Sequence, residues 1–456
     1  MRLALLGGGG FRVPLVFHAL TADPHHTVDE VVLYDRDLGR LHRVRTVLAG
    51  LVEHAAEQGR TASRPPRVVV STDLAEAVSG ADFVFCAIRV GGLDGRVCDE
   101  RAALDQGLLG QETTGAGGVC YGLRTVPVAV RIARAVRRLT PDAWVVNFTN
   151  PAGMVTEAMA AELGDRVVGI CDSPVGLFAR VARALDVDPD LATFDYAGLN
   201  HLGWLRRVLV DGVDLLPSLL ADDARLAGVE EARLFGADWL RTLRVVPNEY
   251  LYYWYFTADA VRSSRRAGPT RGEYLRDQQA GFYAAGGEQD PRAAYEAWQA
   301  ARRDRERSYM ADSREATGAG AREAPGLGDD GGYPAVALRL MTALAGGREA
   351  SLVLNVRNRG ALPGLDDDAV VEVPCRVGGS GPRAVAVGPL DPGAGALVQS
   401  VKHVERTTID AARAGSRALA VRALAEHPLV DSVTRARAVL DTQLARLPEL
   451  AAVLPR

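Results

Sequence analysis

The first ten residues join a short apolar segment directly to a run of four glycines. Met1–Leu6 is predicted to be a buried strand, and a helical pattern of apolar residues follows the glycines over Phe11–Leu20. A strand that turns through glycine into a helix places backbone N–H groups and the helix N-terminus at the strand's carboxyl end. Such a turn can hold the pyrophosphate of a dinucleotide, so it favours an α/β fold for this half of the chain.

The pattern of alternating strands and helices continues beyond this turn. We expect strands at Val31–Asp35, Arg67–Ser71 and Ala81–Ile88, a long helix at Leu38–Ala56 and a helical turn at Ala75–Val78. Short links between alternating strands and helices predict a parallel sheet with right-handed crossovers.

The candidate NAD site consists of Gly7, Gly8, Gly9 and Gly10 with Asp35, which ends the second predicted strand. An acid at this place accepts hydrogen bonds from the adenosine ribose, and its charge favours NAD over NADP. The match is imperfect, because Arg12 stands where a third glycine is usual. An ordinary tight strand-to-helix turn is the alternative interpretation.

Two further strands are predicted in this half, and the strand–helix alternation is lost near 195–200. The α/β class is therefore expected to comprise an N-terminal Rossmann-like, doubly wound parallel sheet (1–198) and a C-terminal α+β catalytic and oligomerisation domain (199–456). The other predicted elements are strands at 143–151, 351–357 and 369–375, a strand within 167–176 that ends in a polar turn, helices at 123–139, 152–162, 175–185, 333–344, 398–425 and 434–446, a turn at 358–360 and an exposed loop at 316–332.

The composition is that of a soluble globular protein. The chain has 456 residues, 48% hydrophobic and 24% charged, with a formal net charge of −4. This charge gives no reason to expect nucleic acid or a membrane surface as a partner. Lys402 is the single lysine, so a phosphate-binding Walker lysine is excluded from the glycine turn.

The five cysteines have no repeated spacing and an odd count, which disfavours a disulfide framework. A reducing cytoplasm fits this usage best. We see no signal peptide and no apolar run long enough to span a membrane.

Polar residues follow several of the predicted strands. Cys171 and Asp172 end one strand, His201 follows another short apolar approach, and Asn150 is held before Pro151. A thiolate and an imidazole at the same mouth could share a divalent metal. Taken singly, each residue also has an ordinary structural interpretation: a buried thiol, a hydrogen-bonded histidine, and an asparagine that caps a helix.

Two arginines, Arg89 and Arg96, lie in a predicted loop after the fourth strand and could bind an anion, or could simply be solvated. The densest aromatic cluster is 246–256, which alone could be core or dimer-interface packing. Arg271 follows that cluster.

Four segments closely resemble the family 4 glycoside hydrolases: Gly110–Gly118, Asn147–Gly153, Ile170–Gly176 and Gly198–Trp204. These are NAD- and metal-dependent enzymes that include 6-phospho-β-glucosidases and 6-phospho-α-glucosidases, and they depart from two-carboxylate glycoside hydrolysis. The resemblance runs from Met1 to the C-terminal helices. It departs at Gly10, Phe11 and Arg12, where the family usually has serine after the third glycine.

The resemblance implies roles for individual residues. Cys171 and His201 match two ligands of a divalent metal, usually Mn²⁺, and Tyr250 matches the base that removes the C2 proton. The neighbouring Tyr252 and Tyr253 are alternatives for this base. The other matches are a sugar-binding Asn150, a general acid of the α-type enzymes at Asp172, an arginine near the base at Arg271, substrate-binding Arg89 and Arg96, and the NAD site at Gly7–Gly10 and Asp35.

The implied chemistry is an oxidation followed by elimination. NAD⁺ takes the C3 hydride, the metal stabilises the enolate formed when the base removes the C2 proton, the aglycone leaves, water adds, and the hydride returns. A thiolate and an imidazole suit Mn²⁺, Fe²⁺, Co²⁺ or Ni²⁺. The metal and a nearby arginine are expected to lower the pKa of Tyr250.

The anomeric preference is divided between segments. Arg89–Arg96 and Asn147–Gly153 resemble the phospho-β-glucosidase branch, whereas Asp172 and Asn200–Trp204 resemble the α branch. We favour a 6-phospho-β-glucosidase acting on a small-molecule glycoside, as a homodimer or homotetramer. The alternatives are a 6-phospho-α-glucosidase, an NAD-dependent sugar or hydroxy-acid dehydrogenase, and a non-catalytic NAD or sugar-phosphate sensor.

Overall fold

The N-terminal half forms a parallel sheet in the strand order β3-β2-β1-β4-β5-β6, as expected for a dinucleotide-binding domain. The computed structural model describes residues 1–58, 64–284, 290–318 and 332–455. The parallel strands are β1 (Arg2–Leu6), β2 (Glu30–Tyr34), β3 (Arg67–Ser71), β4 (Phe83–Cys86), β5 (Trp144–Asn147) and β6 (Val167–Gly169).

Helices cover both faces of this sheet. Along β1, Leu3 and Leu5 pack with α1 and α2, whereas Ala4 and Leu6 pack with α3, α5 and α6. Because alternate side chains of a strand point to opposite faces, this burial confirms the predicted doubly wound arrangement. The helices are α1 (Val13–Thr21), α2 (Leu38–Glu57), α3 (Leu74–Val78), α4 (Gly92–Asp105), α5 (Ala116–Leu139), α6 (Ala152–Leu163), η1 (Gly164–Arg166) and α7 (Ser173–Leu185).

Antiparallel strands of the C-terminal half extend the same sheet. β11 pairs with β6, and the order continues β12-β7-β8-β10, with β13 on β12 and β9 on β8. The division into domains 1–198 and 199–456 stays a prediction, since one sheet runs across it. These strands are β7 (Thr193–Leu199), β8 (Leu202–Val210), β9 (Val213–Asp214), β10 (Val246–Pro247), β11 (Ala350–Arg357), β12 (Val370–Gly378) and β13 (Gly381–Ala384).

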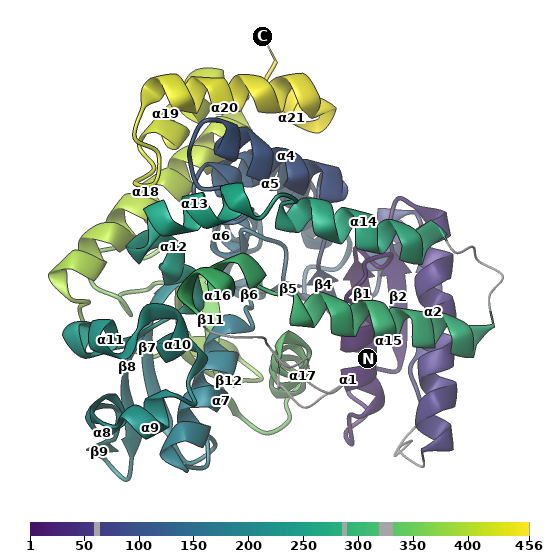
Figure 1. Cartoon of the computed structure of the whole chain (residues 1–456). Helices are drawn as coiled ribbons and strands as arrows, with labels where there is room; N and C mark the ends of the chain where they lie inside the picture. Colours follow the sequence, from purple (N-terminus) through teal and green to yellow (C-terminus); the bar gives the residue numbers. More distant parts are fainter. Residues whose placement is uncertain (59–63, 285–289, 319–331, 456) are drawn as a thin grey trace.

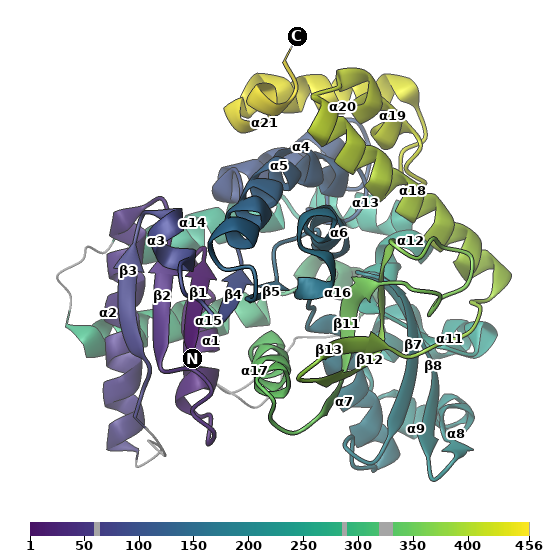
Figure 2. The ribbon, with the colours of Figure 1, turned by 180° about the vertical axis from the view of Figure 1, so that it is seen from behind.

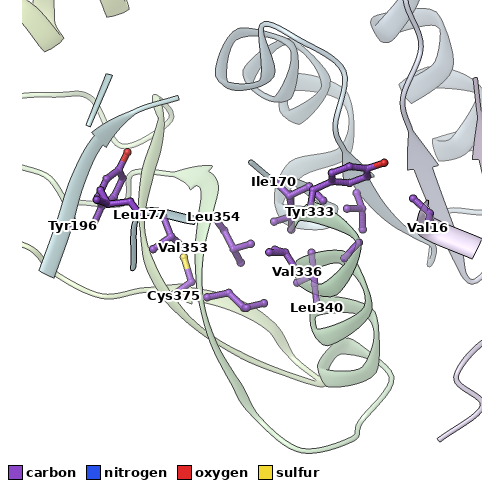
Figure 3. Packing of buried hydrophobic residues seen from close by; sticks show 14 of the residues in the cluster. Val16, Ile170, Leu177, Tyr196, Tyr333, Val336, Leu340, Val353, Leu354 and Cys375 are labelled. Carbon is purple, nitrogen blue, oxygen red and sulfur yellow. The ribbon is translucent and has the colours of Figure 1, made fainter. Parts of the chain in front are cut away.

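One helix fills the space between the parallel and the antiparallel parts of the sheet. Helix α17 (Tyr333–Leu344) has the predicted bounds and contacts α1, β11 and β12. Figure 3 shows its Val336 and Leu340 between Val353 and Leu354 of β11 on one side and Val16 of α1 on the other. The core is therefore continuous between the two halves.

The C-terminal helices pack against α4 and α5, above the sheet in Figures 1 and 2. Their inner faces are rich in alanine, as expected. The helix predicted at 398–425 is wrong as a single element, because Gly415 adopts a left-handed conformation (φ 63°) that ends one helix before the next begins. The helices are α18 (Pro392–Ala414), α19 (Arg417–Ala425), α20 (Val433–Arg446) and α21 (Pro448–Val453).

The remaining described helices lie over the sheet. Short ones carry the aromatic cluster, and the longer α15 runs beside α2 (Figure 1). They are α8 (Leu216–Ala221), α9 (Asp223–Leu226), α10 (Glu230–Phe235), α11 (Ala237–Leu243), η2 (Glu249–Leu251), α12 (Tyr252–Tyr255), α13 (Thr257–Arg266), α14 (Arg271–Ala284), α15 (Pro291–Arg307) and α16 (Ala311–Thr317).

Three other predicted boundaries change. The segment 89–96, predicted as a loop, enters α4 at Gly92, and α5 begins seven residues before the predicted helix. The strand predicted to carry Cys171 and Asp172 at its carboxyl end stops at Gly169, so that Cys171 lies in the link to α7. The predicted loop 316–332 lies mostly outside the described residues. Among the described helices, none combines the length and the apolar character needed to cross a bilayer.

Candidate active site

A cavity of about 2090 Å³ lies where the parallel strands end and reaches across to the antiparallel half. It is larger than a typical site for one small ligand, so a dinucleotide and a sugar can share it. Gly8 is the one predicted site residue that does not line it. The predicted residues that do are Gly7, Gly9, Gly10, Asp35, Arg89, Arg96, Asn150, Cys171, Asp172, His201, Tyr250 and Arg271.

The glycine turn has the geometry of a dinucleotide cradle. The Gly9 backbone N–H donates to Asp35 Oδ2 at 3.1 Å. A Cβ at Gly9 would lie 2.8 Å from Arg40 Cβ, and one at Gly8 would lie 2.7 Å from Leu33 Cβ. Side chains are therefore excluded at both positions, with Gly9 facing the cavity and Gly8 packed on β2. These residues fit NAD.

The Arg12 side chain extends from the glycine turn towards Asp172, which follows β6. Its guanidinium lies 3.9 Å from Asp172 Oδ2 and over the rings of Phe148 and Tyr333. Burial opposes its charge, but Asp172 and Tyr333 more than compensate, so the pKa of Arg12 is raised. The residue that breaks the glycine pattern thus links the nucleotide turn to the end of β6.

Cys171 is a buried thiol that lines the cavity, 5% exposed. Burial raises its pKa well above the ordinary value, and Glu372 and Asp172 raise it further. The protein alone therefore keeps it protonated. A divalent cation would displace this proton, because a coordinating thiol is bound as the thiolate.

His201 lies in the two-residue link between β7 and β8, with a positive φ of 61°. Its Nδ1 is 3.0 Å from Thr113 Oγ1, and no described residue gives Nε2 a hydrogen bond. Burial lowers the pKa of the imidazole to about 3, although Glu112 opposes the shift. The ring is therefore neutral, which is the form that binds metals, with Nε2 free to do so.

The donor set fits a borderline divalent metal such as Mn²⁺. One thiol and one neutral imidazole line the same cavity, although the described residues contain no group of three or more His, Cys, Asp and Glu side chains placed to hold an ion. Two protein ligands leave several coordination positions for water and sugar oxygens, as a catalytic metal site requires.

Tyr250 stands directly against this candidate metal site. Its ring stacks on the His201 ring, and its hydroxyl accepts a hydrogen bond from Tyr309 Oη at 3.3 Å. Burial and Glu249 raise the pKa of the phenol, although the Tyr309 bond opposes the rise. The protein alone therefore does not produce the lowered pKa that was expected for Tyr250. Of the neighbouring tyrosines, Tyr253 also lines the cavity and Tyr252 does not.

Arg89 lies in the predicted loop, between β4 and α4, whereas Arg96 lies within α4, and neither is simply solvated, because each binds a carboxylate. Both guanidiniums bind Glu112, at 2.5 and 2.7 Å, and Arg96 also binds Glu100 at 2.8 Å. Burial opposes ionisation of Glu112, but the two arginines lower its pKa to about 2. The carboxylate therefore holds both cations in place at the cavity wall.

Arg271 lines the cavity and is held by α15 and the residue that follows it. Its guanidinium donates to Ser308 Oγ and to the Arg305 backbone carbonyl, at 2.6 and 2.8 Å. No described carboxylate lies within 4.0 Å of the Arg271 or Arg305 guanidinium. Burial, helped by Arg12 and Arg271, lowers the pKa of Arg305 to about 9. The Glu306 carboxylate favours the charge of both arginines, but neither forms an ion pair with a described carboxylate.

Asn150 also lines the cavity, after β5 and before a cis peptide bond to Pro151. The N-cap of α6 is Pro151, with no side-chain cap, so the alternative role of Asn150 as a helix cap is wrong.

Two family models match nearly the whole chain. The first, Family 4 glycosyl hydrolase, matches residues 2–187, and the second, Family 4 glycosyl hydrolase C-terminal domain, matches residues 196–430. The chain belongs to glycosyl hydrolase family 4. The resemblance noted in the sequence is therefore confirmed.

This family 4 glycosyl hydrolase is similar to both glucosidase branches. A probable 6-phospho-beta-glucosidase of Bacillus subtilis is 34% identical, over 97% of this chain and 96% of the relative. The structure of the 6-phospho-beta glucosidase from Thermotoga maritima with manganese, NAD⁺ and glucose-6-phosphate has a TM-score of 0.79 at 28% identity, over 98% of each chain. A 6-phospho-alpha-glucosidase from gut microorganisms in complex with NAD and Mn²⁺ has a TM-score of 0.77 at 26% identity, over 97% of each chain.

Sequence reasoning missed four side chains of this family 4 site. Thr113 and Glu112 lie in the segment 110–118, which the resemblance used without assigning roles within it. Tyr309 and Arg305 lie near the end of α15 and had no sequence signal, because neither belongs to a motif or follows a predicted strand.

Proposed function

We propose that this protein is a glycosidase that cleaves 6-phosphorylated β-glucosides and depends on NAD and a divalent metal, most simply Mn²⁺. One observation carries the proposal: a single cavity is lined by the dinucleotide turn and by Cys171, His201 and Tyr250. A hydride acceptor, a metal and a base can therefore meet at one sugar ring.

Gly7, Gly9, Gly10 and Asp35 would hold NAD, and Cys171 and His201 Nε2 would hold the metal. When bound, these groups supply a reversible hydride acceptor and a Lewis acid for the sugar's O2 and O3. Thr113 fixes the imidazole by its bond to Nδ1, so that the other nitrogen faces the cavity.

Tyr250 removes the proton from C2 of the sugar. Its hydroxyl accepts a hydrogen bond from Tyr309, which stabilises the phenolate form that a base needs. Asn150 binds sugar hydroxyls at the end of β5. Asp172, also at the cavity wall, lies where it can donate a proton to a departing aglycone.

Arg271 and Arg305 bind the 6-phosphate. Both are half-buried cations that form no ion pair with a described carboxylate, and a dianionic phosphate would relieve their mutual repulsion. Arg89 and Arg96, which are paired with the carboxylates of Glu112 and Glu100, instead shape the wall of the substrate site.

The β preference is supported by the 34% identical relative from Bacillus subtilis. A 6-phospho-α-glucosidase is the second candidate, and Asp172 at the cavity favours it. A simple dehydrogenase would accumulate NADH with its substrate, whereas a glycosidase that returns its hydride would not. A sensor would show no metal-dependent turnover.

The deciding experiment measures release of nitrophenol from α and β nitrophenyl glucosides, each with and without a 6-phosphate, in NAD⁺, Mn²⁺ and thiol. We expect turnover of the β 6-phosphate and no accumulation of NADH. Turnover of the α 6-phosphate alone would reassign the enzyme to the other branch, and turnover of neither would refute the proposal.

The remaining expectations belong to the same proposal. A homodimer or homotetramer, acting in the cytoplasm, is expected, and light scattering after gel filtration tests the assembly. The five cysteines are all free and buried, which suits a reducing compartment.

A further inference from the structure

Glu372 is a buried carboxylate that does not line the cavity, and it binds three side chains from other strands or their links. It lies on β12 and is 1% exposed. Its Oε1 accepts from Asn355 Nδ2 at 2.9 Å and Asn200 Nδ2 at 3.2 Å, and its Oε2 accepts from Tyr196 Oη at 3.1 Å. All three partners are donors, which a carboxylate can accept together.

The first contact holds the link that carries His201. Asn200 and His201 form the whole connection between Leu199 of β7 and Leu202 of β8. His201 has a positive φ, which is unfavourable for a residue other than glycine and persists only where the surrounding structure imposes it. The bond from Asn200 to Glu372 holds this link through two residues that do not line the cavity.

The second contact reaches the segment that carries Tyr250. Tyr196 Oη donates to Glu372 and accepts from Asn248 Nδ2 at 3.4 Å. The Asn248 Oδ1 in turn accepts from the Tyr250 backbone N–H at 3.0 Å. Asn248 and Tyr196 are both 0% exposed, so this chain of hydrogen bonds is shielded from water.

The third contact reaches the strand that delivers Cys171. Asn355 of β11 is paired with Gly169, the last residue of β6 and two residues before Cys171. The two residues are so close that a Cβ at Gly169 would lie 2.8 Å from Asn355 Cβ. The Asn355 side chain therefore packs directly against the end of β6.

We propose that Glu372 is a positioning residue that sets the relative placement of Cys171, His201 and Tyr250 from outside the cavity. The inference rests on the proposed function, because it takes the first two residues as metal ligands and the third as the base. One carboxylate reaches all three segments, each of which comes from a different strand or strand link. Their mutual geometry is then fixed before any ligand binds, as preorganised sites require.

The network predicts different effects for different substitutions. In Glu372→Leu all three bonds are lost. In Glu372→Gln the amide oxygen can still accept from both asparagines, but its NH₂ faces Tyr196 Oη, which already accepts from Asn248. Asn200→Ala breaks the arm to His201, and Tyr196→Phe breaks the arm to Tyr250.

The test titrates each purified protein with Co²⁺ and records the absorption band of a cobalt–thiolate bond, with NAD affinity measured separately by fluorescence. We expect Asn200→Ala and Glu372→Leu to weaken Co²⁺ binding about 10- to 100-fold without changing NAD affinity. Tyr196→Phe leaves in place the Glu372 charge that acts on Cys171, so it should retain Co²⁺ affinity to within a few-fold and lower kcat, with a larger isotope effect for substrate deuterated at C2. Glu372→Gln should lower kcat in the same way.

Glu157→Gln is the matched control. Glu157 is a buried carboxylate that accepts from Lys402 Nζ at 2.8 Å and from the Val370 backbone N–H at the start of the same strand, outside the cavity. It should lower thermal stability and leave Co²⁺ affinity unchanged.

Two results separate failure of this inference from failure of the proposed function. If Cys171→Ser retains the wild-type Co²⁺ band, the metal site itself is misplaced. If that band depends on Cys171 but folded Asn200→Ala and Glu372→Leu proteins bind Co²⁺ as tightly as wild type, the positioning role is refuted. Should Glu372→Leu fail to fold, the milder Asn200→Ala decides alone.

Discussion

The rings of His201 and Tyr250 lie face to face, with centroids 3.6 Å apart and planes 3° from parallel. The candidate metal ligand and the candidate base are therefore in van der Waals contact. A charge bound at the imidazole would act on the phenol at short range, where little water screens it. Metal loading and the acidity of the base are coupled by this contact.

Tyr250→Phe should abolish proton removal while it keeps the stacked ring. We expect kcat to fall about 10²- to 10⁴-fold, the range for loss of a general base, with NAD and Mn²⁺ affinities retained. Steady-state kinetics and exchange of C2 deuterium into solvent measure this. Tyr252→Phe, a buried neighbour outside the cavity, is the control. Equal losses in both variants would point to packing instead of proton transfer.

Cys171→Ser should remove metal-dependent activity and leave NAD affinity nearly intact, because the glycine turn lies on a different strand. Isothermal titration with Mn²⁺ and with NAD⁺ checks both parts. Cys375→Ser replaces another buried thiol, one that donates to the Val373 carbonyl, and should bind Mn²⁺ normally. Loss of NAD binding in the Cys171 variant would show that the residue is misplaced.

Arg305→Met should weaken glucose 6-phosphate binding about 10- to 100-fold and leave unphosphorylated glucose unaffected, because hydrogen bonds to charged groups contribute about 1.5–3 kcal/mol. Competitive inhibition by each sugar gives the comparison. Arg303→Met, an exposed arginine of the same helix, is the control. Equal weakening for both sugars would contradict a phosphate role.

Asp35→Ala should weaken NAD⁺ binding about 10- to 100-fold through lost hydrogen bonds to the ribose. It should weaken NADP⁺ binding less, because Arg36 and Arg40 line the same cavity. Asp37→Ala is the control. The Asp37 carboxylate is the N-cap of α2 and accepts from the Arg40 backbone N–H at 3.0 Å, so its loss should lower stability only. An unchanged ratio of NAD⁺ to NADP⁺ affinity would refute the ribose contact.

His427 should destabilise the protein in mild acid. The imidazole stacks on Trp254, and burial lowers its pKa from 6.5 to about 4. The unfolded chain takes up the proton first, so stability is lost as the pH falls from about 6.5 towards 4. His427→Asn does not titrate and can still accept from the Leu429 N–H. Between pH 7 and pH 5 the wild type should lose about 2 kcal/mol more than this variant in urea unfolding. A pH-independent difference would contradict the shift.

The predictable parts of the site follow predicted strands. Asp35, Asn150 and Cys171 could be placed at one edge, because parallel strands all end on the same side of a sheet. His201 was placed by its approach strand and by resemblance. Arg89 and Arg96 were predicted to lie at the site in a loop, and only Arg89 does. The helix α4 that carries Arg96 has a glycine N-cap, a glycine as its first residue and no strong apolar stripe, so its pattern did not indicate a helix.

Local patterns in the sequence determined the parallel sheet, the glycine turn and the family, because strand alternation, turn chemistry and motif spacing act between residues close together in the chain. Only the tertiary structure decided that Thr113 binds His201, that Tyr309 binds Tyr250 and that Glu372 contacts three separate segments. Those contacts join residues far apart in sequence. Antiparallel pairing of β11 with β6 and of β12 with β7 brings Glu372 to its partners, and burial makes its polar contacts obligatory.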